Sequence, residues 1–177
     1  MNFEPLEKNL IDIIKEEQAK LGYQKERIRL YYPLSSLNHF FNSHYDVREM
    51  KQCLEEFCLF AAPRLGSIDI SNRGERFCFS IPEAGAEYVH QHTADNEFIY
   101  ALVKTVSRHG CSMEDILSVF RKYSGQLHVE KVHNGEFDYL VYFENGEPDT
   151  YRYCFHFEEH HIIYHRYLSE DYEDLGL

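Results

Sequence analysis

The chain has 177 residues, 44% of them hydrophobic, and a formal net charge of −12. A length of this order is typical of one domain, and we expect residues 1–177 to form a single α+β domain. Because so acidic a chain repels phosphate backbones and anionic lipid, the composition argues against a nucleic-acid or membrane partner and suits a basic protein or a cationic ligand.

The cysteines indicate a reducing compartment. There are five, an odd number, and none belongs to a C-x-x-C pair. Residues 1–20 are amphipathic and charged, without the apolar centre of a secretory signal, and no apolar run approaches the roughly 18 residues of a transmembrane helix. We therefore expect a cytoplasmic protein with reduced thiols.

The first third of the chain predicts helices around one short strand. Pro5 suits the start of the first helix, which Gly22 ends, and alternating apolar residues follow at 28–32. Asp46 and Glu49 have the spacing of a capping box for a longer helix. We expect that helix to end before Pro63.

Residues 67–81 predict a β-hairpin. Ile68 and Ile70 alternate before a Ser-Asn-Arg-Gly segment, and Phe77, Phe79 and Ile81 alternate after it. An even number of loop residues places the isoleucines on the face of the phenylalanines, so we expect a loop of two or four residues.

One short basic cluster precedes this hairpin. It consists of Lys25, Arg27 and Arg29, with Glu26 in its midst. We interpret it as the solvated face of the strand at 28–32, because a single charge run is usually a solvated surface.

Three further helices are predicted between residues 82 and 125. Pro82 is expected to open the first and Asp95 to cap the second. Ser112, with Asp115 three residues later, is expected to cap the third. Residues 1–125 are therefore mostly helical, apart from the hairpin.

From residue 126 onward the apolar period changes to two. The pattern predicts four strands, near 126–133, 136–144, 149–157 and 160–168. The expected turns are Asn134-Gly135, a turn around Asn145-Gly146, and Glu158-Glu159. We expect residues 126–168 to form a four-stranded antiparallel meander, and residues 169–177 to be an acidic tail.

If all three turns hold even numbers of residues, parity assigns every side chain of the meander to one of two faces. One face is apolar and should pack on the helices: Leu127, Val129, Leu140, Tyr142, Tyr151, Tyr153, Phe155, Ile162, Tyr164 and Leu168. We call the other the histidine face: His128, Glu130, Val132, Phe137, Tyr139, Val141, Phe143, Arg152, Cys154, His156, His161, Ile163, His165 and Tyr167. In this register His156 lies opposite His161, and Arg152 lies opposite His165.

The histidine face is the candidate binding surface, because exposing so many aromatic side chains to water is unfavourable. The residues that we expect to bind a ligand or partner are Tyr139, Arg152, His156, His161 and His165. A segment of the N-terminal half that covers this face would explain the same pattern.

A metal site on the same face is an alternative hypothesis. His156 and His161, with Cys154 and His128, could converge on a transition metal such as zinc. Because His, Tyr and Arg also occur on ordinary wet sheet faces, no cofactor is predicted and zinc remains the alternative.

Signatures of catalysis are incomplete. Residues 156–160 match the H-x-x-E-H motif of zinc proteases, but that motif needs a helix and this segment alternates as a strand does. Cys111 beside the Ser112 cap is the best-placed nucleophile, although packing on Ile116 explains it more simply. No phosphate-binding glycine loop, serine-hydrolase motif or kinase motif occurs.

The C-terminal strands carry a resemblance to other proteins. Tyr151-Arg152-Tyr153-Cys154-Phe155 and Tyr164-His165-Arg166-Tyr167 resemble segments of an uncharacterised bacterial family of similar length, and the resemblance spans most of the chain. It implies a small bacterial cytoplasmic protein, with no implied activity and no functional residue.

The sequence favours a non-catalytic binding or protein-interaction module over an enzyme. Its partner would be a protein or a small molecule bound on the histidine face. The two alternatives are a metal-binding protein or small enzyme with its site on that face, and a homo-oligomer that uses the face as its interface.

Overall fold

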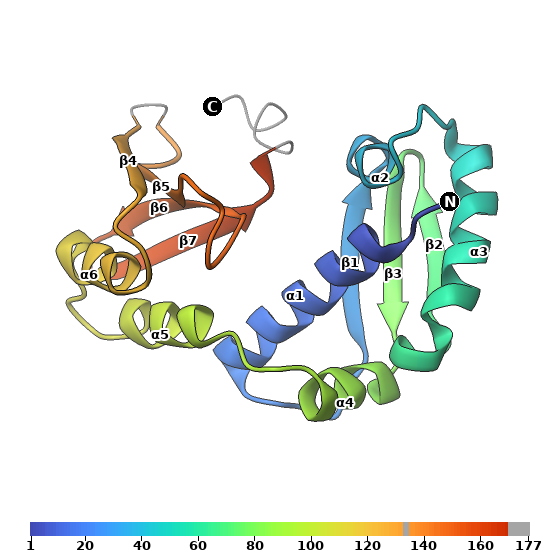
Figure 1. Cartoon of the computed structure of the whole chain (residues 1–177), viewed down its shortest axis with the longest axis horizontal. Coiled ribbons are helices and arrows are strands. Elements are labelled where there is room, and N and C mark those ends of the chain that lie inside the picture. Colours follow the sequence, from blue (N-terminus) through green and yellow to red (C-terminus); the bar gives the residue numbers. More distant parts are fainter. Residues whose placement is uncertain (133–134, 170–177) are drawn as a thin grey trace. The chain divides into compact units, whose positions relative to one another are not determined.

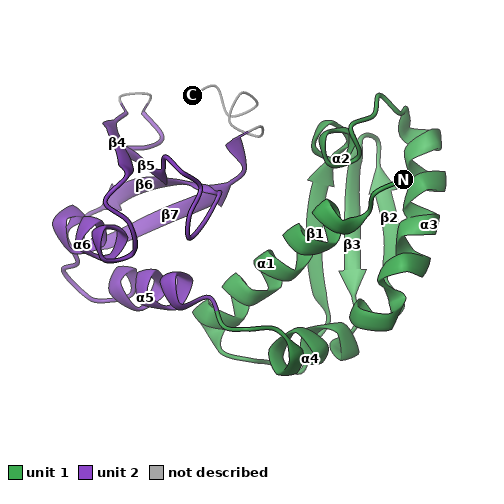
Figure 2. Cartoon of the chain, in the orientation of Figure 1, with its two compact units in different colours: residues 1–95 green, residues 96–177 purple. Residues whose placement is uncertain are grey.

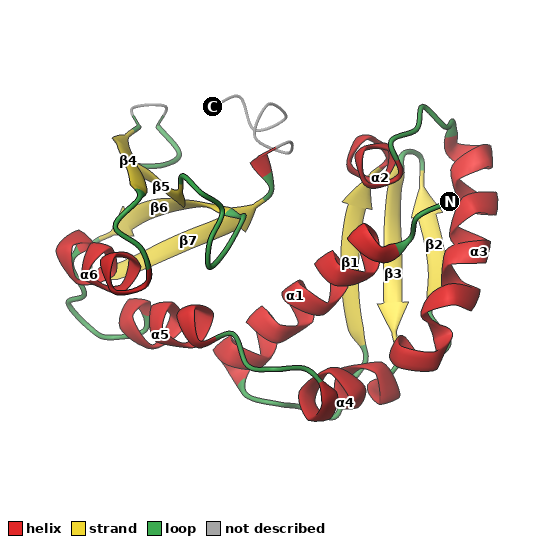
Figure 3. Cartoon of the chain, viewed as in Figure 1, coloured by secondary structure: helices red, strands yellow, loops and turns green. Residues whose placement is uncertain are grey.

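The computed structural model describes residues 1–132 and 135–169 of an α+β protein, in which six helices accompany two antiparallel sheets (Figures 1 and 3). The chain divides into two compact units, residues 1–95 and residues 96–177 (Figure 2). The expected α+β class and the C-terminal four-stranded meander are confirmed. No described helix is both long and apolar enough to cross a membrane.

The first unit contains four helices and a three-stranded sheet. In chain order its elements are α1 (Glu4–Leu21), β1 (Ile28–Pro33), α2 (Leu34–Phe41), α3 (Val47–Leu65), β2 (Asp69–Arg73), β3 (Arg76–Ile81) and α4 (Glu83–His92). The strand order is β1-β3-β2, so β3 is central and antiparallel to both neighbours.

The expected hairpin is β2 and β3. Arg73 pairs with Arg76 and leaves a two-residue turn at Gly74 and Glu75, where Gly74 takes a positive φ of 60° that other residues rarely adopt. Ile70 lies opposite Phe79, as the even loop requires. The addition of β1 to the other side of β3 was not anticipated from the sequence.

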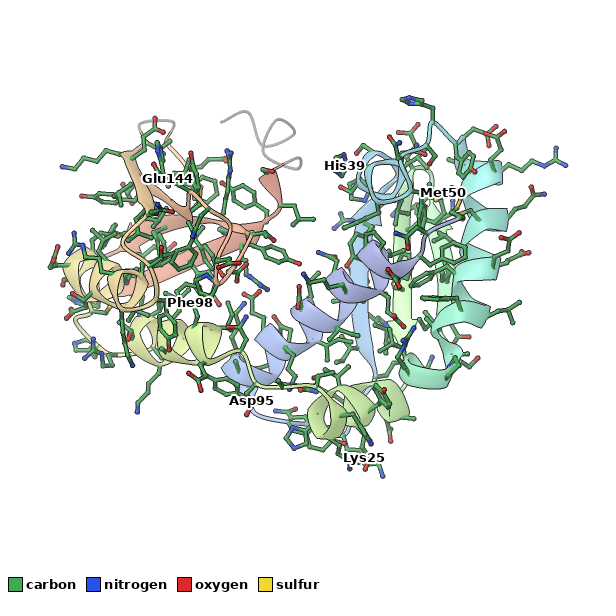
Figure 4. All side chains as sticks on the ribbon, viewed as in Figure 1. Lys25, His39, Met50, Asp95, Phe98 and Glu144 are labelled. Atoms are coloured by element: carbon green, nitrogen blue, oxygen red, sulfur yellow. The ribbon has the colours of Figure 1, made fainter. Side chains whose placement is uncertain are left out.

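One face of this sheet forms the core of the first unit. Phe77, Phe79 and Ile81 of β3 are fully buried. They belong to one apolar cluster with residues from α1, α2 and α3, among them Met50, which is labelled on α3 in Figure 4. The opposite face of the sheet, called the outer face below, carries exposed or half-buried side chains.

Helix ends follow the sequence in part. Both capping boxes, Asp46 with Glu49 and Ser112 with Asp115, are present. Two details were wrong: α3 continues through Pro63 to Leu65, and Asn96 in place of Asp95 caps the following helix by accepting a hydrogen bond from the backbone of Ile99.

The described residues of the second unit form two helices and the four-stranded sheet. Its elements are α5 (Glu97–Val106), α6 (Met113–Tyr123), β4 (Leu127–Lys131), β5 (Tyr139–Phe143), β6 (Arg152–Glu158) and β7 (His161–Tyr167), with strand order β4-β5-β6-β7. Phe98 of α5, labelled in Figure 4, has its ring 4.9 Å from Phe120, 5.0 Å from Phe143 and 5.7 Å from Tyr153. Both helices therefore cover one face of this sheet.

The face assignment of β5 was wrong. Lys131 pairs with Tyr139 and Tyr142 pairs with Arg152, so odd numbers of residues separate the paired positions on each side of β5. An odd separation inverts a strand relative to its neighbours. Tyr139, Val141 and Phe143 therefore lie on the helix-covered face, whereas Leu140 and Tyr142 lie on the histidine face. Asn134 of the expected turn is outside the described residues.

The faces of β4, β6 and β7 are as expected, but the register of the last hairpin was wrong. Its turn is Glu159-His160, one position later than predicted, because Glu158 pairs with His161. His156 consequently lies opposite Ile163, and Arg152 lies opposite Tyr167.

A buried ion pair fastens the loop before β6 to β7. The Arg166 Nη2 atom lies 3.0 Å from Asp149 Oδ2, and the two side chains are 3% and 2% exposed. Asp149 also accepts hydrogen bonds from the Tyr151 backbone and from the Tyr153 hydroxyl, and the guanidinium carbon of Arg166 lies 3.7 Å from the centre of the Tyr151 ring. Since the described partners of the carboxylate all come from the same unit, we interpret this cluster as structural.

The close approach of α4 to α3 gives a stability prediction. A Cβ atom on Gly85 would meet the Leu65 carbonyl oxygen and would lie 2.7 Å from Ile81 Cγ2. We expect Gly85→Ala to lower the free energy of unfolding by about 1–3 kcal/mol, the usual cost of overpacking. Gly125→Ala, which meets nothing within 4 Å, is the control and should change it by less than about 0.5 kcal/mol. Equal effects in urea denaturation would contradict the packing.

The buried ion pair gives a second prediction. Asp149→Ala leaves Arg166 buried without its carboxylate, so we expect a loss of about 3–5 kcal/mol. Glu114→Ala removes one partner of the exposed Arg121–Glu114 pair and should cost less than about 1 kcal/mol. Both can be measured by circular dichroism in denaturant. A small effect of Asp149→Ala would show that the pair is not a stabilising contact.

Candidate functional site

The structure separates the five predicted binding residues. Tyr139 lies on the helix-covered face, where its ring is 5.9 Å from that of Phe157. Arg152, His156, His161 and His165 share the histidine face, as predicted, but they do not form one cluster. His161 and His165 are exposed, and His165 contacts the ring of Phe137 at 5.3 Å.

The best-organised part of the histidine face is a stack across three strands. The ring of His128 in β4 lies 4.6 Å from that of Tyr142 in β5, almost parallel to it, and the Arg152 guanidinium carbon lies 4.5 Å from the centre of the Tyr142 ring. Beside the stack, Cys154 Sγ lies 2.8 Å from the Tyr167 hydroxyl, and Leu140 completes a small buried cluster. These polar side chains already interact with one another within the fold.

The geometry proposed for a metal site is wrong. His156 does not face His161, and its Nδ1 atom instead lies 3.2 Å from Asp138 Oδ2, in an orientation that makes no hydrogen bond. Cys154 is buried and interacts with Tyr167. Across residues 1–132 and 135–169, no three His, Cys, Asp or Glu side chains are grouped so that they could hold a metal ion.

The catalytic candidates also differ from the geometry their chemistry needs. His156 lies in strand β6 while Glu159 and His160 form a turn, so the H-x-x-E-H match is not helical. Burial raises the pKa of the thiols of Cys58, Cys111 and Cys154, and it raises the pKa of Cys53 to about 11. A raised pKa lowers the thiolate fraction near neutral pH, which disfavours these cysteines as nucleophiles.

A different surface has the features of a binding site. The outer face of the β1-β3-β2 sheet contains a groove of about 630 Å³ that we call the arginine groove. Its lining residues are Arg29, Tyr31, Asp69, Ile70, Ser71, Asn72, Arg73, Arg76, Cys78 and Ser80. Three arginines and one aspartate line it, in a chain whose net charge is −12.

Strand pairing arranges these side chains in three rows across the sheet. Arg29, Ser80 and Asp69 form one end row, and Tyr31, Cys78 and Ser71 form the middle row. Arg76 and Arg73 occupy the other end row with Pro33. The two end rows are four residues apart along β3, or roughly 14 Å at the rise of an antiparallel strand. The groove is therefore cationic at both ends and uncharged between them.

The charges inside the groove are unevenly compensated. Arg27 lies 2.9 Å from Asp69 and neutralises the acid of the first row. Arg76 lies over the Tyr31 ring at 5.1 Å. No described acidic side chain forms an ion pair with Arg29 or Arg73. Arg73 and Arg76 are moreover directly opposite each other, and like charges in that position repel.

The sequence contained half of the signal for this groove. Arg29 belongs to the basic cluster at residues 25–29, which we interpreted as a solvated strand face. Arg73 and Arg76 flank the hairpin turn, and they alternate with the half-buried residues of β2 and the buried residues of β3. What the sequence lacked was the pairing of β1 with β3, which brings the two groups of arginines onto one surface.

Comparisons with known proteins give a family and nothing further. A family model described as "Domain of unknown function, E. rectale Gene description (DUF3877)" matches residues 3–176. No curated protein and no solved structure matches the chain. The match agrees with the resemblance to an uncharacterised bacterial family that the sequence suggested.

Proposed function

We propose that this chain, which belongs to the DUF3877 family, is a non-catalytic binding module that holds an anionic partner in the arginine groove. One observation carries the proposal. Three arginines surround a groove in which the single acid is already paired with Arg27, although acidic residues outnumber basic ones in the chain by 30 to 18.

The chemistry of arginine supports this assignment. A guanidinium presents planar, forked donors that match carboxylate and phosphate groups, and it is hydrated more weakly than an ammonium. The middle row adds two hydrogen-bonding groups, Ser71 and Tyr31, and Tyr31 is 55% exposed. The groove thus offers charge at its ends and an amphipathic centre, which suits binding and requires no reacting group.

The net charge of the chain and the local charge of the arginine groove favour partners of opposite sign. The total charge of −12 favours a basic partner at long range. Exposed charges are screened beyond about 8–10 Å at physiological salt, so the local arginines dominate once an anionic group enters the groove. An anionic partner narrow enough to enter the groove is therefore favoured over an extended polyanionic surface.

Charge reversal in the groove tests the proposal. We expect Arg29→Glu/Arg73→Glu to weaken binding of poly-L-glutamate by at least about tenfold, since two guanidinium groups that form no ion pair with a described acid are replaced by repelling carboxylates. Titration followed by NMR gives the affinity. Lys8→Glu/Arg48→Glu, two exposed changes on α1 and α3 with the same alteration of net charge, is the matched control. If both double variants weaken binding equally, general electrostatics and not the groove is responsible.

The histidine face remains a second candidate, as a protein-interaction surface or a homo-oligomer interface. The observation that favours it is Ile163, which is 40% exposed opposite His156, on the same face of the sheet as the His128–Tyr142–Arg152 stack and the apolar cluster of Leu140. A face that combines an exposed aliphatic residue with aromatic and arginine side chains has the composition of many interface centres.

Solution mass tests this second candidate. If the face joins two copies, the mass should rise with concentration in analytical ultracentrifugation, and Ile163→Glu should restore the monomer because it buries a charge in the contact. Val129→Glu, at a 43% exposed site on the opposite face of the sheet, should leave the assembly unchanged. A monomer at every concentration would exclude the homo-oligomer. If Ile163→Glu and Val129→Glu changed the solution mass equally, the histidine face would not be the interface.

A further inference from the structure

The arginine groove is too long for one compact anion to use all of its arginines. Arg29 lies in one end row, and Arg73 and Arg76 lie in the other, roughly 14 Å away along the strands. A phosphate or a single carboxylate reaches only one end. A ligand that engages both must be extended and must carry negative charge at two separated points.

We propose that the occupant is an extended acidic segment of a protein partner, lying along the strands with acidic side chains four residues apart. This inference rests on the proposed function and names its ligand. Alternate residues of an extended chain point to one side, and residues i and i+4 are roughly 14 Å apart, which is the separation of the two end rows. One acid meets Arg29, the other lies between Arg73 and Arg76, and residue i+2 lies over Tyr31 and Cys78.

Electrostatics at the second end adds a reason for an acid there. Arg73 and Arg76 face each other across β2 and β3 without an acidic partner between them among the described residues. A carboxylate between two guanidinium groups accepts charge-assisted hydrogen bonds from both and offsets their repulsion. The neutral centre explains the spacing, because a uniformly charged ligand would leave its middle charges without partners.

Alternative anions fit less well. A nucleic-acid strand carries its charge at every nucleotide, so it would place phosphates over the uncharged middle row, and the net charge of −12 would repel the rest of the strand. A compact anion gains nothing from the distance between the rows. Both alternatives are distinguished by the test that follows.

Peptide spacing is the decisive measurement. The probe is an acetylated and amidated peptide of sequence Gly-Glu-Ser-Thr-Ser-Glu-Gly, whose two acids are four residues apart. Its comparison peptide, Gly-Glu-Glu-Ser-Thr-Ser-Gly, has the same composition with adjacent acids. We expect the first to bind the wild-type chain about fivefold more tightly, which is the contribution of one additional exposed ion pair of about 1 kcal/mol. Arg29→Gln, which removes one end without adding a negative charge, should abolish the difference.

Cys78 reports whether the peptide occupies the middle row. The thiol is half-buried at the centre of the groove, between Tyr31 and Ser71 in the strand pairing. We expect the first peptide to slow alkylation of Cys78 by iodoacetamide, measured by mass spectrometry, while the half-buried Cys111 of the other unit reacts at an unchanged rate.

The outcomes separate this inference from the proposed function. Equal affinity of the two peptides, or equally tight binding of inorganic pyrophosphate with the same loss in Arg29→Glu/Arg73→Glu, would overturn the extended segment and leave an anion-binding groove. Tighter binding of oligothymidylate, lost in that variant, would assign the groove to nucleic acid and also overturn it. Failure of every anion to bind would overturn both.

Discussion

The alternation of side chains along β3 is the constraint on which both the core and the candidate site of the first unit depend. Phe77, Phe79 and Ile81 point into the core, so Arg76, Cys78 and Ser80 must point to the outer face. Because β3 is hydrogen-bonded on both sides, a shift of its register by one residue would bury an arginine and expose a phenylalanine. The packing energy of the core therefore fixes the position of the groove residues, without any contact in the groove having to contribute.

The sequence predicted what is local and missed what depends on strand pairing. The capping boxes at Asp46 and Ser112 and the two-residue hairpin turn depend on neighbours in sequence, and the structure contains them. Residues 139–143, Tyr-Leu-Val-Tyr-Phe, are apolar at every position, so no alternation could decide which side faces the helices, and β5 was inverted. The arginine groove was missed for a related reason: two helices and strand β2 separate β1 from β3 in sequence, and no local pattern predicts that they pair.

The histidine face shows that a high content of histidine in one sheet does not by itself establish a metal site. Six of the eleven histidines lie within residues 126–168, which made this sheet the candidate site, and the histidines of β6 and β7 do share one face. The metal hypothesis needed more, because it required two imidazoles directly opposite each other. A turn one position later than expected moved His156 opposite Ile163, which is enough to separate the proposed ligands. Metal coordination depends on distances of about 2 Å, so a register difference of this size separates His156 from His161 by more than the proposed geometry allows.

The two candidate surfaces differ most in how far their polar groups are already satisfied. On the histidine face, His128, Tyr142 and Arg152 stack on one another and Cys154 contacts Tyr167, so a partner would have to replace contacts that the fold already makes. In the arginine groove, Arg29 and Arg73 form no ion pair with a described acid. The Arg76 guanidinium lies over the face of the Tyr31 ring. A partner that supplies carboxylates there gains charge-assisted hydrogen bonds without breaking any within the protein. For this reason we favour the groove over the histidine face as the binding surface.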